Sequence, residues 1–457
     1  MSPTPGRRQF LKTAAAAVAT AQFPILGANE RINLGVIGLG GRGTNHIDFY
    51  STLDADCRFA ALCAVNQAAR ERATARIQKN KSYAPKNYSD MRQLFDDKDV
   101  DAVSVATPNH WHALTTIWAC QAGKDVYVEK PASHNIFEGH QMVAAARKYN
   151  RMVQVGSQSR SITHKMKAIG LLEQGAIGQI YHARGLCFRR RFSIGHAPDE
   201  PVPPGLDWSI FLGPAQMRPY SKNKFAYNWH WFWDTGNGDI GNQGVHEMDI
   251  NLWGLGRPGW PLSVASMGGK FVWQDDQETP NTQSTTFDFG DAHMSFDARN
   301  LPSPPEGLMG LRGPNYVGNI FFGESGFLIV DEDGFQVYKG TAGNISGDAA
   351  RGAGAGSREK YELAMDEKAV ETDGTAQTTP HMKNFFDAIR KRDHTMLHAE
   401  IEIGARSAAY CHLANIAYRV GRTLRMAQST GRFIDDQEAN SMLTRNYRAP
   451  YVVPASV

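Results

Sequence analysis

Cysteine is scarce in this sequence and is never clustered. The chain has five cysteines, and no two of them form a CxxC pair. Structural zinc sites need closely spaced ligands, and disulfide scaffolds need a dense and even set of cysteines. No metal site and no disulfide framework are therefore expected, and the five are predicted to be buried packing residues. They are Cys57, Cys63, Cys120, Cys187 and Cys411.

The sequence also lacks an excess of one charge and any long basic run. Lysine and arginine number 49 against 46 aspartates and glutamates, which leaves a formal net charge of +3. Proteins that bind nucleic acid usually carry a basic patch or stripe, so small molecules are the expected partners and nucleic acid is not. With 457 residues and no internal repeat, the chain is long enough for two domains.

No apolar run reaches the roughly 20 residues that a membrane-spanning helix needs. Near the N-terminus, Arg7 and Arg8 precede an alanine-rich stretch, Thr13 to Leu26, which is too short to span a bilayer. This pattern predicts a twin-arginine signal over residues 1–28, cleaved after Ala28. We therefore expect no stable membrane insertion, recognition by the twin-arginine export machinery, and a periplasmic location.

Residues 31–155 alternate between short apolar runs and helical stretches. The first run, Ile32 to Gly38, is rich in β-branched residues and stops at glycines, which is typical of a buried parallel strand. Further strands and helices are predicted at 59–65, 69–79, 101–107, 112–122, 125–128, 136–149 and 152–156. This alternation predicts an α/β domain with a doubly wound parallel sheet of the Rossmann type.

The remaining residues, 156–457, are predicted to form a second domain in which strands follow one another without intervening helices. Turn residues separate predicted strands at 180–188, 263–273, 283–289, 293–297 and 327–331. This spacing predicts a large, mainly antiparallel sheet. The glycine-rich stretch 340–357 is expected to be a loop, and helices are expected at 381–391 and 400–424.

A G-x-G-x-x-G hexamer follows the first predicted strand and precedes a helical stretch. The first glycine allows a tight turn, the second lets the backbone approach a pyrophosphate, and the third allows close helix packing. A plain structural turn is the alternative, but the strand–loop–helix context favours dinucleotide binding. The six candidate residues are Gly38, Leu39, Gly40, Gly41, Arg42 and Gly43.

Three further positions follow predicted strands and should lie at the same edge of the sheet. Asn66 occupies the place where an NAD site usually carries an acid on the ribose. An asparagine can form a hydrogen bond with a ribose hydroxyl, but it does not repel a 2′-phosphate. Arg42 could assist the binding of that phosphate, so the choice between NAD and NADP is weakly specified. The segments Thr107–His112 and Glu129–Pro131 could each be a simple turn, but together with the glycine loop they indicate a ligand site.

This combination of motifs resembles the Gfo/Idh/MocA oxidoreductases, from Ile32 to about Tyr451. The resemblance implies that Lys130 contacts the nicotinamide ribose and the substrate hydroxyl. It further implies that the other cofactor contacts come from Thr107, Pro108, His110 and Glu129.

The segment Gly236–His246 resembles the family's active-site segment, in which an aspartate precedes a catalytic histidine by four residues. His246 matches the histidine, whereas Asn242 stands in the place of the aspartate. An asparagine can orient a substrate hydroxyl, but it carries no negative charge that would raise the basicity of a neighbouring histidine. Asp239 could supply that missing charge. Lys130, Asn242 and His246 are thus the predicted catalytic residues, and the alternative for His246 is a structural histidine.

Aromatic rings crowd the segment Tyr227–Asp234. Such rings suit the apolar face of a pyranose, but an anchor for the second sheet explains them equally well. His230 is therefore only a candidate ligand. Arg160 follows the strand that ends at Gly156 and is expected near cofactor or substrate, without a catalytic role.

The resemblance implies an NAD(P)-dependent oxidoreductase that transfers hydride between a carbohydrate hydroxyl and the nicotinamide, with NAD favoured over NADP. Two alternatives stay open: a glycosidase that oxidises its substrate transiently with bound NAD, and a non-catalytic sugar-binding protein. Because export would remove the chain from the cytoplasmic nucleotide pool, the cofactor is expected to be tightly bound. An exposed sheet face in the second domain favours a homo-oligomer, either a dimer or a tetramer.

Overall fold

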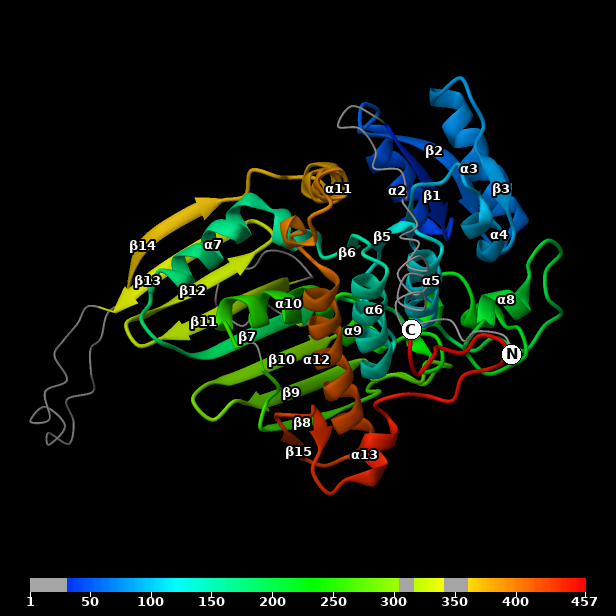
Figure 1. The fold of residues 1–457 in the computed structure, drawn as a ribbon. Helices are drawn as coiled ribbons and strands as arrows, with labels where there is room; N and C mark the ends of the chain where they lie inside the picture. Colours follow the sequence, from blue (N-terminus) through cyan, green and yellow to red (C-terminus); the bar gives the residue numbers. More distant parts are fainter. Residues whose placement is uncertain (1–30, 258, 304–315, 341–360) are drawn as a thin grey trace, which may run out of the picture.

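The computed structural model describes residues 31–257, 259–303, 316–340 and 361–457, and its first domain is built on a six-stranded parallel sheet (Figure 1). The strand order is β3-β2-β1-β4-β5-β6, which reverses between β1 and β4. Ligands bind at such a reversal in open α/β sheets. The strands are β1 (Ile32–Ile37), β2 (Cys57–Cys63), β3 (Lys86–Tyr88), β4 (Ala102–Val105), β5 (Asp125–Val128) and β6 (Val153–Val155).

Helices cover this sheet, and polar side chains set where several of them begin. Asn66, Asp90 and Asn135 each accept a hydrogen bond from a backbone N–H in the first turn of α3, α4 and α6. Helix α2 starts after Gly40 without a capping side chain, so its first N–H groups face the glycine loop unshielded. The helices are α2 (Gly41–Ser51), α3 (Gln67–Asn80), α4 (Met91–Asp96), α5 (Asn109–Gln121) and α6 (Ile136–Lys148).

The second domain contains a ten-stranded sheet in the order β14-β13-β12-β11-β7-β10-β9-β8-β15-β16. Every neighbouring pair is antiparallel except β7 with β10, which run parallel. The prediction of a mainly antiparallel sheet is therefore confirmed. The strands are β7 (Ile180–Phe188), β8 (Ser263–Gly269), β9 (Thr282–Asp288), β10 (His293–Arg299), β11 (Tyr316–Gly323), β12 (Gly326–Asp331), β13 (Gly334–Gly340), β14 (Tyr361–Lys368), β15 (Leu424–Ala427) and β16 (Arg432–Phe433).

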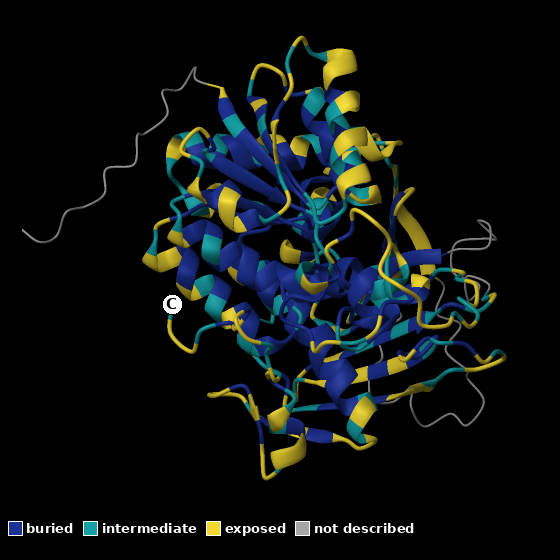
Figure 2. Ribbon diagram, turned by 90° about the vertical axis from the view of Figure 1, so that its right-hand side faces the viewer, coloured by how far each residue is buried: buried dark blue, intermediate teal, exposed yellow. Residues whose placement is uncertain are grey.

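The long helix α12 (Ile401–Val420) joins the domains, because it packs on β8 of the second sheet and on α6 of the first domain. Helix α10 (Gly244–Leu255) packs on β7 and on α12. Figure 2 shows this central layer as mostly buried. The other helices of this part are α7 (Thr163–Glu173), α8 (Trp208–Leu212), α9 (Gly238–Asn242), α11 (Gly374–Lys391) and α13 (Gln437–Ser441), with 3-10 turns η1 (Gln158–Ser161), η2 (Lys222–Lys224), η3 (Asn228–Trp231) and η5 (His394–Met396).

The core of the first domain includes residues from the end of the chain. Helix α11 places Met382, Phe385 and Phe386 in one apolar cluster with residues of β1, β2 and α2. The rings of Phe386 and Tyr50 lie 5.5 Å apart between centroids. Residues of α12 and of the C-terminal segment join the cluster on the other side of the sheet. The six-stranded parallel sheet is thus covered partly by residues that are distant from it in the sequence.

Most predicted elements are confirmed, β7 to the residue, but some strands and helices were not expected. The unpredicted β14 is exposed along most of its length and is polar, and α10 is buried nearly all round, so neither shows a one-sided apolar period. The predicted loop at 340–357 begins at the last residue of β13, and the rest of this loop lies outside the described residues. The predicted signal at 1–28 also lies outside the described residues.

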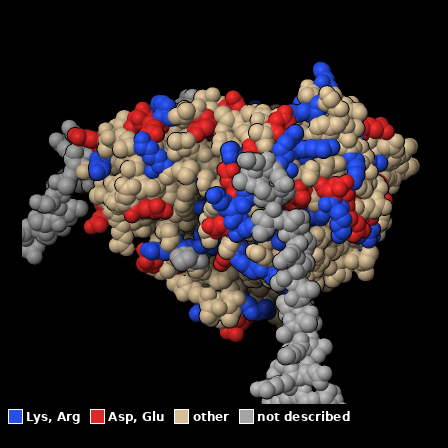
Figure 3. All heavy atoms as spheres, turned by 45° about the horizontal axis from the view of Figure 1, so that its top comes forward, with Lys and Arg blue, Asp and Glu red and all other residues tan. Residues whose placement is uncertain are grey.

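Other general expectations concern the cysteines and the surface. All five cysteines are buried free thiols, which confirms their predicted packing role. Among the described residues, no helix combines the length and apolar character that crossing a membrane requires. Basic and acidic side chains both occur across the face shown in Figure 3.

Candidate active site

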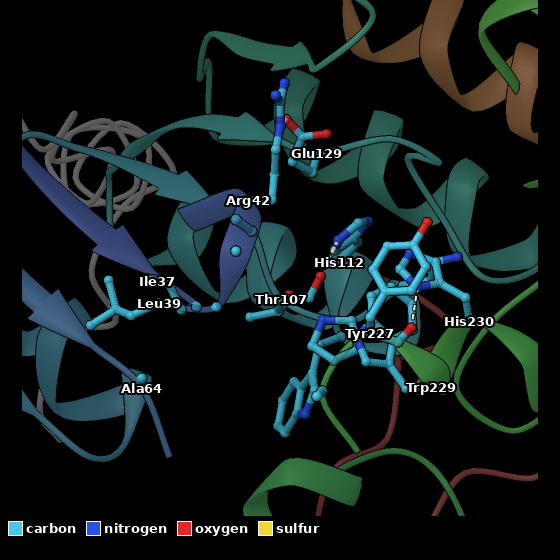
Figure 4. A pocket seen from close by; sticks show the side chains of 18 of the residues that line it. Ile37, Leu39, Arg42, Ala64, Thr107, His112, Glu129, Tyr227, Trp229 and His230 are labelled. Atoms are coloured by element: carbon cyan, nitrogen blue, oxygen red, sulfur yellow. Dashed lines mark hydrogen bonds and ion pairs between the residues drawn. The ribbon is translucent and has the colours of Figure 1, made fainter. Parts of the chain in front are cut away.

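A cavity of about 830 Å³ lies between the domains, at the carboxyl edge of the Rossmann sheet. On the Rossmann side, its walls are the loops that follow β1, β2, β4 and β5, as expected for a doubly wound sheet. On the other side, they come from the residues after β7, from the Tyr227–His230 segment and from the start of α10 (Figure 4).

The glycine loop has the shape that a pyrophosphate requires. Gly38 adopts a φ of +87°, and a Cβ there would lie 2.5 Å from the carbonyl oxygen of Ala106. A Cβ at Gly43 would collide with the carbonyl oxygen of Gly38, so this glycine lets α2 pack against the turn. A Cβ at Gly40 or Gly41 would meet nothing within 4 Å. The loop therefore presents open backbone to the cavity at the uncapped start of α2, which fits a dinucleotide phosphate.

Asn66 lines the cavity beyond the glycine loop and caps α3. Its Oδ1 accepts a hydrogen bond from the backbone N–H of Ala69 at 3.1 Å. The backbone at Asn66 and Gln67 is hydrogen-bonded to the second domain. Asn66 forms a β-bridge with Leu206, and the N–H of Gln67 donates to the carbonyl of Gly205 at 2.8 Å. With the oxygen used in capping, the amide NH₂ is the part of Asn66 left to meet a ribose.

Glu129 is buried at the end of β5 and is held by two cationic or proton-donating side chains. Arg42 Nε donates to Glu129 Oε1 at 2.7 Å, and His46 Nε2 lies 2.9 Å from the same oxygen. Burial alone would raise the pKa of Glu129, but the charge of Arg42 and the hydrogen bond from His46 hold it well below its usual range. Burial lowers the pKa of His46, so its neutral ring donates from Nε2 to the carboxylate and accepts from Ser104 at Nδ1. Glu129 thus fixes the guanidinium of the glycine loop in place (Figure 4).

Lys130 connects the two domains across the cavity. Its Nζ donates to the backbone carbonyl of Asn242, at the end of α9, at 2.8 Å. Burial lowers the pKa of Lys130, while the charge of Glu129 opposes this shift. The ammonium therefore stands where it can contact a ligand oxygen that lies between the sheet edge and α10.

His246 also lines the cavity, in the first turn of α10. Its side chain is 7% exposed, and its Nδ1 has no hydrogen-bond partner among the described residues. Burial, followed by the charge of Lys130, lowers its pKa well below the ordinary value. A neutral imidazole with an unpartnered ring nitrogen can accept a proton from a ligand hydroxyl. The unpartnered nitrogen favours the catalytic interpretation of His246, which stays a prediction.

Comparisons with known proteins agree with this geometry. Sequence models of an oxidoreductase family match residues 32–157 as its NAD-binding Rossmann fold, and residues 155–276 and 358–453 as its C-terminal α/β domain. The chain belongs to the Gfo/Idh/MocA oxidoreductase family. An alpha-N-acetylgalactosaminidase from Shewanella oneidensis is 27% identical over 157 residues, 34% of either chain. The chain thus spans about a third of the length of the curated relatives it matches.

Solved structures share the fold at lower sequence identity. A levoglucosan dehydrogenase in complex with NADH and levoglucosan is 20% identical and aligns with a TM-score of 0.63 over 87% of this chain and 99% of its own. The WlbA dehydrogenase from Bordetella pertussis, in complex with NADH and UDP-GlcNAcA, is 19% identical with a TM-score of 0.62 over 87% and 99%. These similarities establish the two-domain Gfo/Idh/MocA architecture.

Most of the residues predicted for a Gfo/Idh/MocA site come together in the cavity. Its lining includes Gly38 to Arg42, Asn66, Thr107, Pro108, Glu129, Lys130, Asn242 and His246. Gly43 lies beneath the loop. His110 is not among the lining residues: it is buried, with its ring nitrogens 3.2 Å and 3.0 Å from the carbonyl oxygens of Thr235 and Phe211. Its place in the lining is taken by His112, because residues two apart on α5 face different directions.

Arg160 was expected beside the ligand but lies behind the site. Its guanidinium forms a two-bond ion pair with the fully buried Asp249, at 2.7 Å and 2.9 Å. Ser407 of α12 donates to the same carboxylate at 2.5 Å. Arg160 therefore links η1, α10 and α12, and it does not line the cavity.

The aromatic segment is divided between the cavity and the protein interior. Tyr227, Trp229 and His230 line the cavity, whereas Trp231 and Phe232 are buried in the domain. Figure 4 shows the Tyr227 ring beside His230, whose Nδ1 donates to the backbone carbonyl of Tyr227 at 2.5 Å. Burial lowers the pKa of His230 to about 3, so the ring is neutral at physiological pH.

Sequence reasoning missed two arginines that follow β7. Arg189 and Arg191 line the cavity, where Arg189 Nη1 donates to Gln243 Oε1 at 2.9 Å and Arg191 pairs with Asp239. Their signal is a run of three arginines at the end of a correctly predicted strand. The run was not interpreted because the partners lie about 50 residues further along the chain.

Proposed function

We propose that this protein transfers hydride between a hydroxyl of a sugar or sugar-like substrate and a nicotinamide cofactor that stays bound. The observation that carries the proposal is the convergence of the glycine loop, Lys130 and His246 on one cavity. The loop suits a dinucleotide, and the other two can hold and deprotonate an alcohol where the nicotinamide end of that dinucleotide would lie.

Each side chain has a role that follows from its surroundings. The bound cofactor supplies hydride chemistry, which no amino-acid side chain provides. Lys130 holds the substrate oxygen by a charged hydrogen bond, and the neutral His246 accepts the hydroxyl proton as the carbonyl forms. Asn242 contributes an uncharged amide, so the charge at the reacting oxygen is set by Lys130. The lowered pKa of His246 keeps its imidazole unprotonated at neutral pH, so its free ring nitrogen can accept a hydrogen bond from the substrate hydroxyl.

A segment of the second domain supports tight cofactor binding. We call residues 189–234 the strap, since they cross the cavity from the end of β7 to the edge of the Rossmann sheet. The strap meets Asn66 and Gln67 through backbone hydrogen bonds, and it contributes Ile210, Phe211 and Phe225 to the lining. We expect these contacts to slow the dissociation of a dinucleotide from the cavity.

We propose NAD as the cofactor. Asn66 has an amide N–H to donate to a ribose hydroxyl, and Nε of Arg42 in the glycine loop is bonded to Glu129. The solved relatives named above are complexes with NADH. Because Asn66 exerts no charge repulsion, we expect NADP to be disfavoured only weakly.

Tight retention is compatible with the export that Arg7 and Arg8 suggest. A nucleotide bound before export would be reduced and reoxidised within each catalytic cycle, so no external pool would be needed. The net reaction would be a paired sugar oxidation and reduction, an epimerisation, or an oxidation-assisted bond cleavage.

The test is to purify the protein, remove free nucleotide by gel filtration, and identify any retained nucleotide by mass spectrometry after denaturation. A panel of pyranoses and pyranosides is then added while the absorbance of the reduced nicotinamide is followed. We expect retained NAD and an absorbance change with at least one sugar. Protein that emerges empty and works only with added stoichiometric NAD would contradict retention, and protein that oxidises no sugar even then would contradict the proposed function.

A glycosidase is the second candidate, because relatives that match about a third of the chain are named as glycosidases. In that case the sugar would be oxidised transiently, would eliminate its aglycone as an alcohol, would add water across the resulting double bond and would take back the hydride, so that the net reaction is hydrolysis. Release of p-nitrophenol from a panel of p-nitrophenyl glycosides, without net change in the nicotinamide, distinguishes this reaction from dehydrogenation.

A further inference from the structure

Four polar side chains form a hydrogen-bonded chain along the second-domain wall of the cavity. Arg191 donates to both oxygens of Asp239, at 3.2 Å from Nε and 2.9 Å from Nη2. Asn242 Nδ2 donates to Asp239 Oδ1 at 3.1 Å and to the hydroxyl oxygen of Tyr227 at 3.0 Å. The chain therefore leads from a buried ion pair to a phenol that lines the cavity.

The direction of every bond in this chain is determined by chemistry. A carboxylate only accepts hydrogen bonds, so the group of Asn242 that faces Asp239 is its NH₂. The two hydrogens of that NH₂ then go to Asp239 and Tyr227, and the oxygen of Tyr227 acts as an acceptor. The O–H of Tyr227 must point elsewhere, and in the described part of the chain it has no other partner. It is a free donor beside the predicted catalytic residues.

The ring of Tyr227 is held in this position although it is 50% exposed. The preceding Ala226 has a φ of +50°, an unusual conformation for a residue with a Cβ, which turns the chain toward the cavity. The ring centroid of His230 lies 4.5 Å from that of Tyr227, and the guanidinium of Arg191 lies 5.7 Å from it. Unusual backbone of this kind persists where the surroundings determine it, often at ligand sites.

We propose that Tyr227 is a substrate-binding residue that donates a hydrogen bond to a hydroxyl oxygen of the bound sugar. Asp239 and Arg191 are positioning residues that act through Asn242. The carboxylate of Asp239 is fully engaged, because Arg191, Asn242 and Asn300 all donate to it. Its charge is paired with Arg191, and its hydrogen bond with Asn242 fixes which end of the Asn242 amide faces the cavity. This inference rests on the proposed sugar oxidation.

Tyr227→Phe removes only the hydroxyl, and Tyr181→Phe is its matched control. Tyr181 lies on β7, is 54% exposed, and does not line the cavity. The probes are one pyranoside that the wild type oxidises and its monodeoxy analogues. We expect Tyr227→Phe to lower kcat/KM on the parent sugar by about 2- to 10-fold, the usual value of one uncharged hydrogen bond. The loss should disappear on the one analogue that lacks the hydroxyl bound by Tyr227.

The inference is overturned if Tyr227→Phe matches Tyr181→Phe on the parent sugar, or if its loss is the same on every analogue. A wild type that oxidises no sugar overturns the proposed function and this inference with it. If the wild type turns over but the variants fail these criteria, only the role of Tyr227 is wrong.

Asp239→Asn tests the positioning role. Because an amide at position 239 can donate as well as accept, the Asn242 amide is no longer held in one orientation. In the wild type, kcat/KM should be higher on the parent sugar than on the monodeoxy analogue that lacks the hydroxyl bound by Tyr227. We expect the ratio of these two values to fall toward one in Asp239→Asn. This ratio is independent of the fraction of folded enzyme, so a merely structural role would leave it unchanged. An Asp239→Asn variant with the wild-type ratio overturns the assignment of Asp239.

Discussion

Glu247, the neighbour of His246 on α10, is a buried carboxyl whose protonation should control stability. Its side chain is 3% exposed, and its Oε2 has no hydrogen-bond partner among the described residues. Burial raises its pKa to about 8, although the charge of Lys165 opposes the shift. The folded protein therefore keeps a proton on Glu247 at neutral pH. Glu247→Gln mimics this protonated form in shape and charge.

The size of the effect follows from the two pKa values. The unfolded chain ionises Glu247 above its ordinary pKa of 4.5, whereas the folded chain retains the proton up to about pH 8. Between these values the folded state binds more protons, so its stability falls as pH rises, by about 1.4 kcal/mol per pH unit. From pH 5 to pH 8 the wild type should lose roughly 3 to 4 kcal/mol at this residue. The glutamine variant has no such loss.

The assay is urea unfolding of the wild type, Glu247→Gln and a control, Glu173→Gln, at pH 5, 6.5 and 8. Glu173 is an exposed residue at the end of α7. We expect Glu247→Gln to unfold with nearly the wild-type free energy at pH 5 and to be more stable by roughly 3 kcal/mol at pH 8, while Glu173→Gln follows the wild type. Parallel pH profiles would refute the reasoning. A Glu247→Gln variant less stable at every pH would mean that the native carboxylate is ionised and paired with Lys165.

The remaining predictions concern the cofactor, the reaction and the location. Lys130→Met should abolish turnover while the purified protein retains its nucleotide, because the glycine loop is untouched; loss of nucleotide in mass spectra would contradict this. His246→Ala should lower kcat by about 10²- to 10⁴-fold, as for a general base, and near-normal rates would exclude that role. Asn66→Asp should strengthen the preference for NAD over NADP in binding titrations by repelling a 2′-phosphate, and an unchanged preference would place the ribose elsewhere. Arg7→Lys with Arg8→Lys should leave the protein in the cytoplasm, and cell fractionation that shows unchanged export would refute the signal.

The fold could be predicted where one apolar period dominates a segment. Strands β1, β4 and β5 are buried apolar runs that stop at polar or glycine residues, and they were found close to their true bounds. Helix α10 is buried on nearly every side, so its sequence shows no polar face to reveal a helix. Strand β14 is exposed and charged, and its place is determined by backbone pairing with β13, which no local pattern encodes.

The site could be predicted where the chemistry depends on neighbours in sequence. The glycine loop and Lys130 follow strands directly, so their place at the sheet edge follows from the topology. His110 and His112 could not be separated, because the choice depends on how far α5 is rotated against the strap. The link between Arg191 and Asp239 joins the end of β7 to α9, and only the folded second domain brings them together.

The packing of α11 and α12 has a consequence for biosynthesis. Residues of both helices complete the apolar core on the two sides of the Rossmann sheet. A ribosome that has made only the first 157 residues therefore exposes those apolar residues of the domain that α11 and α12 later cover. Synthesis must pass α12 before both sides of this core are complete.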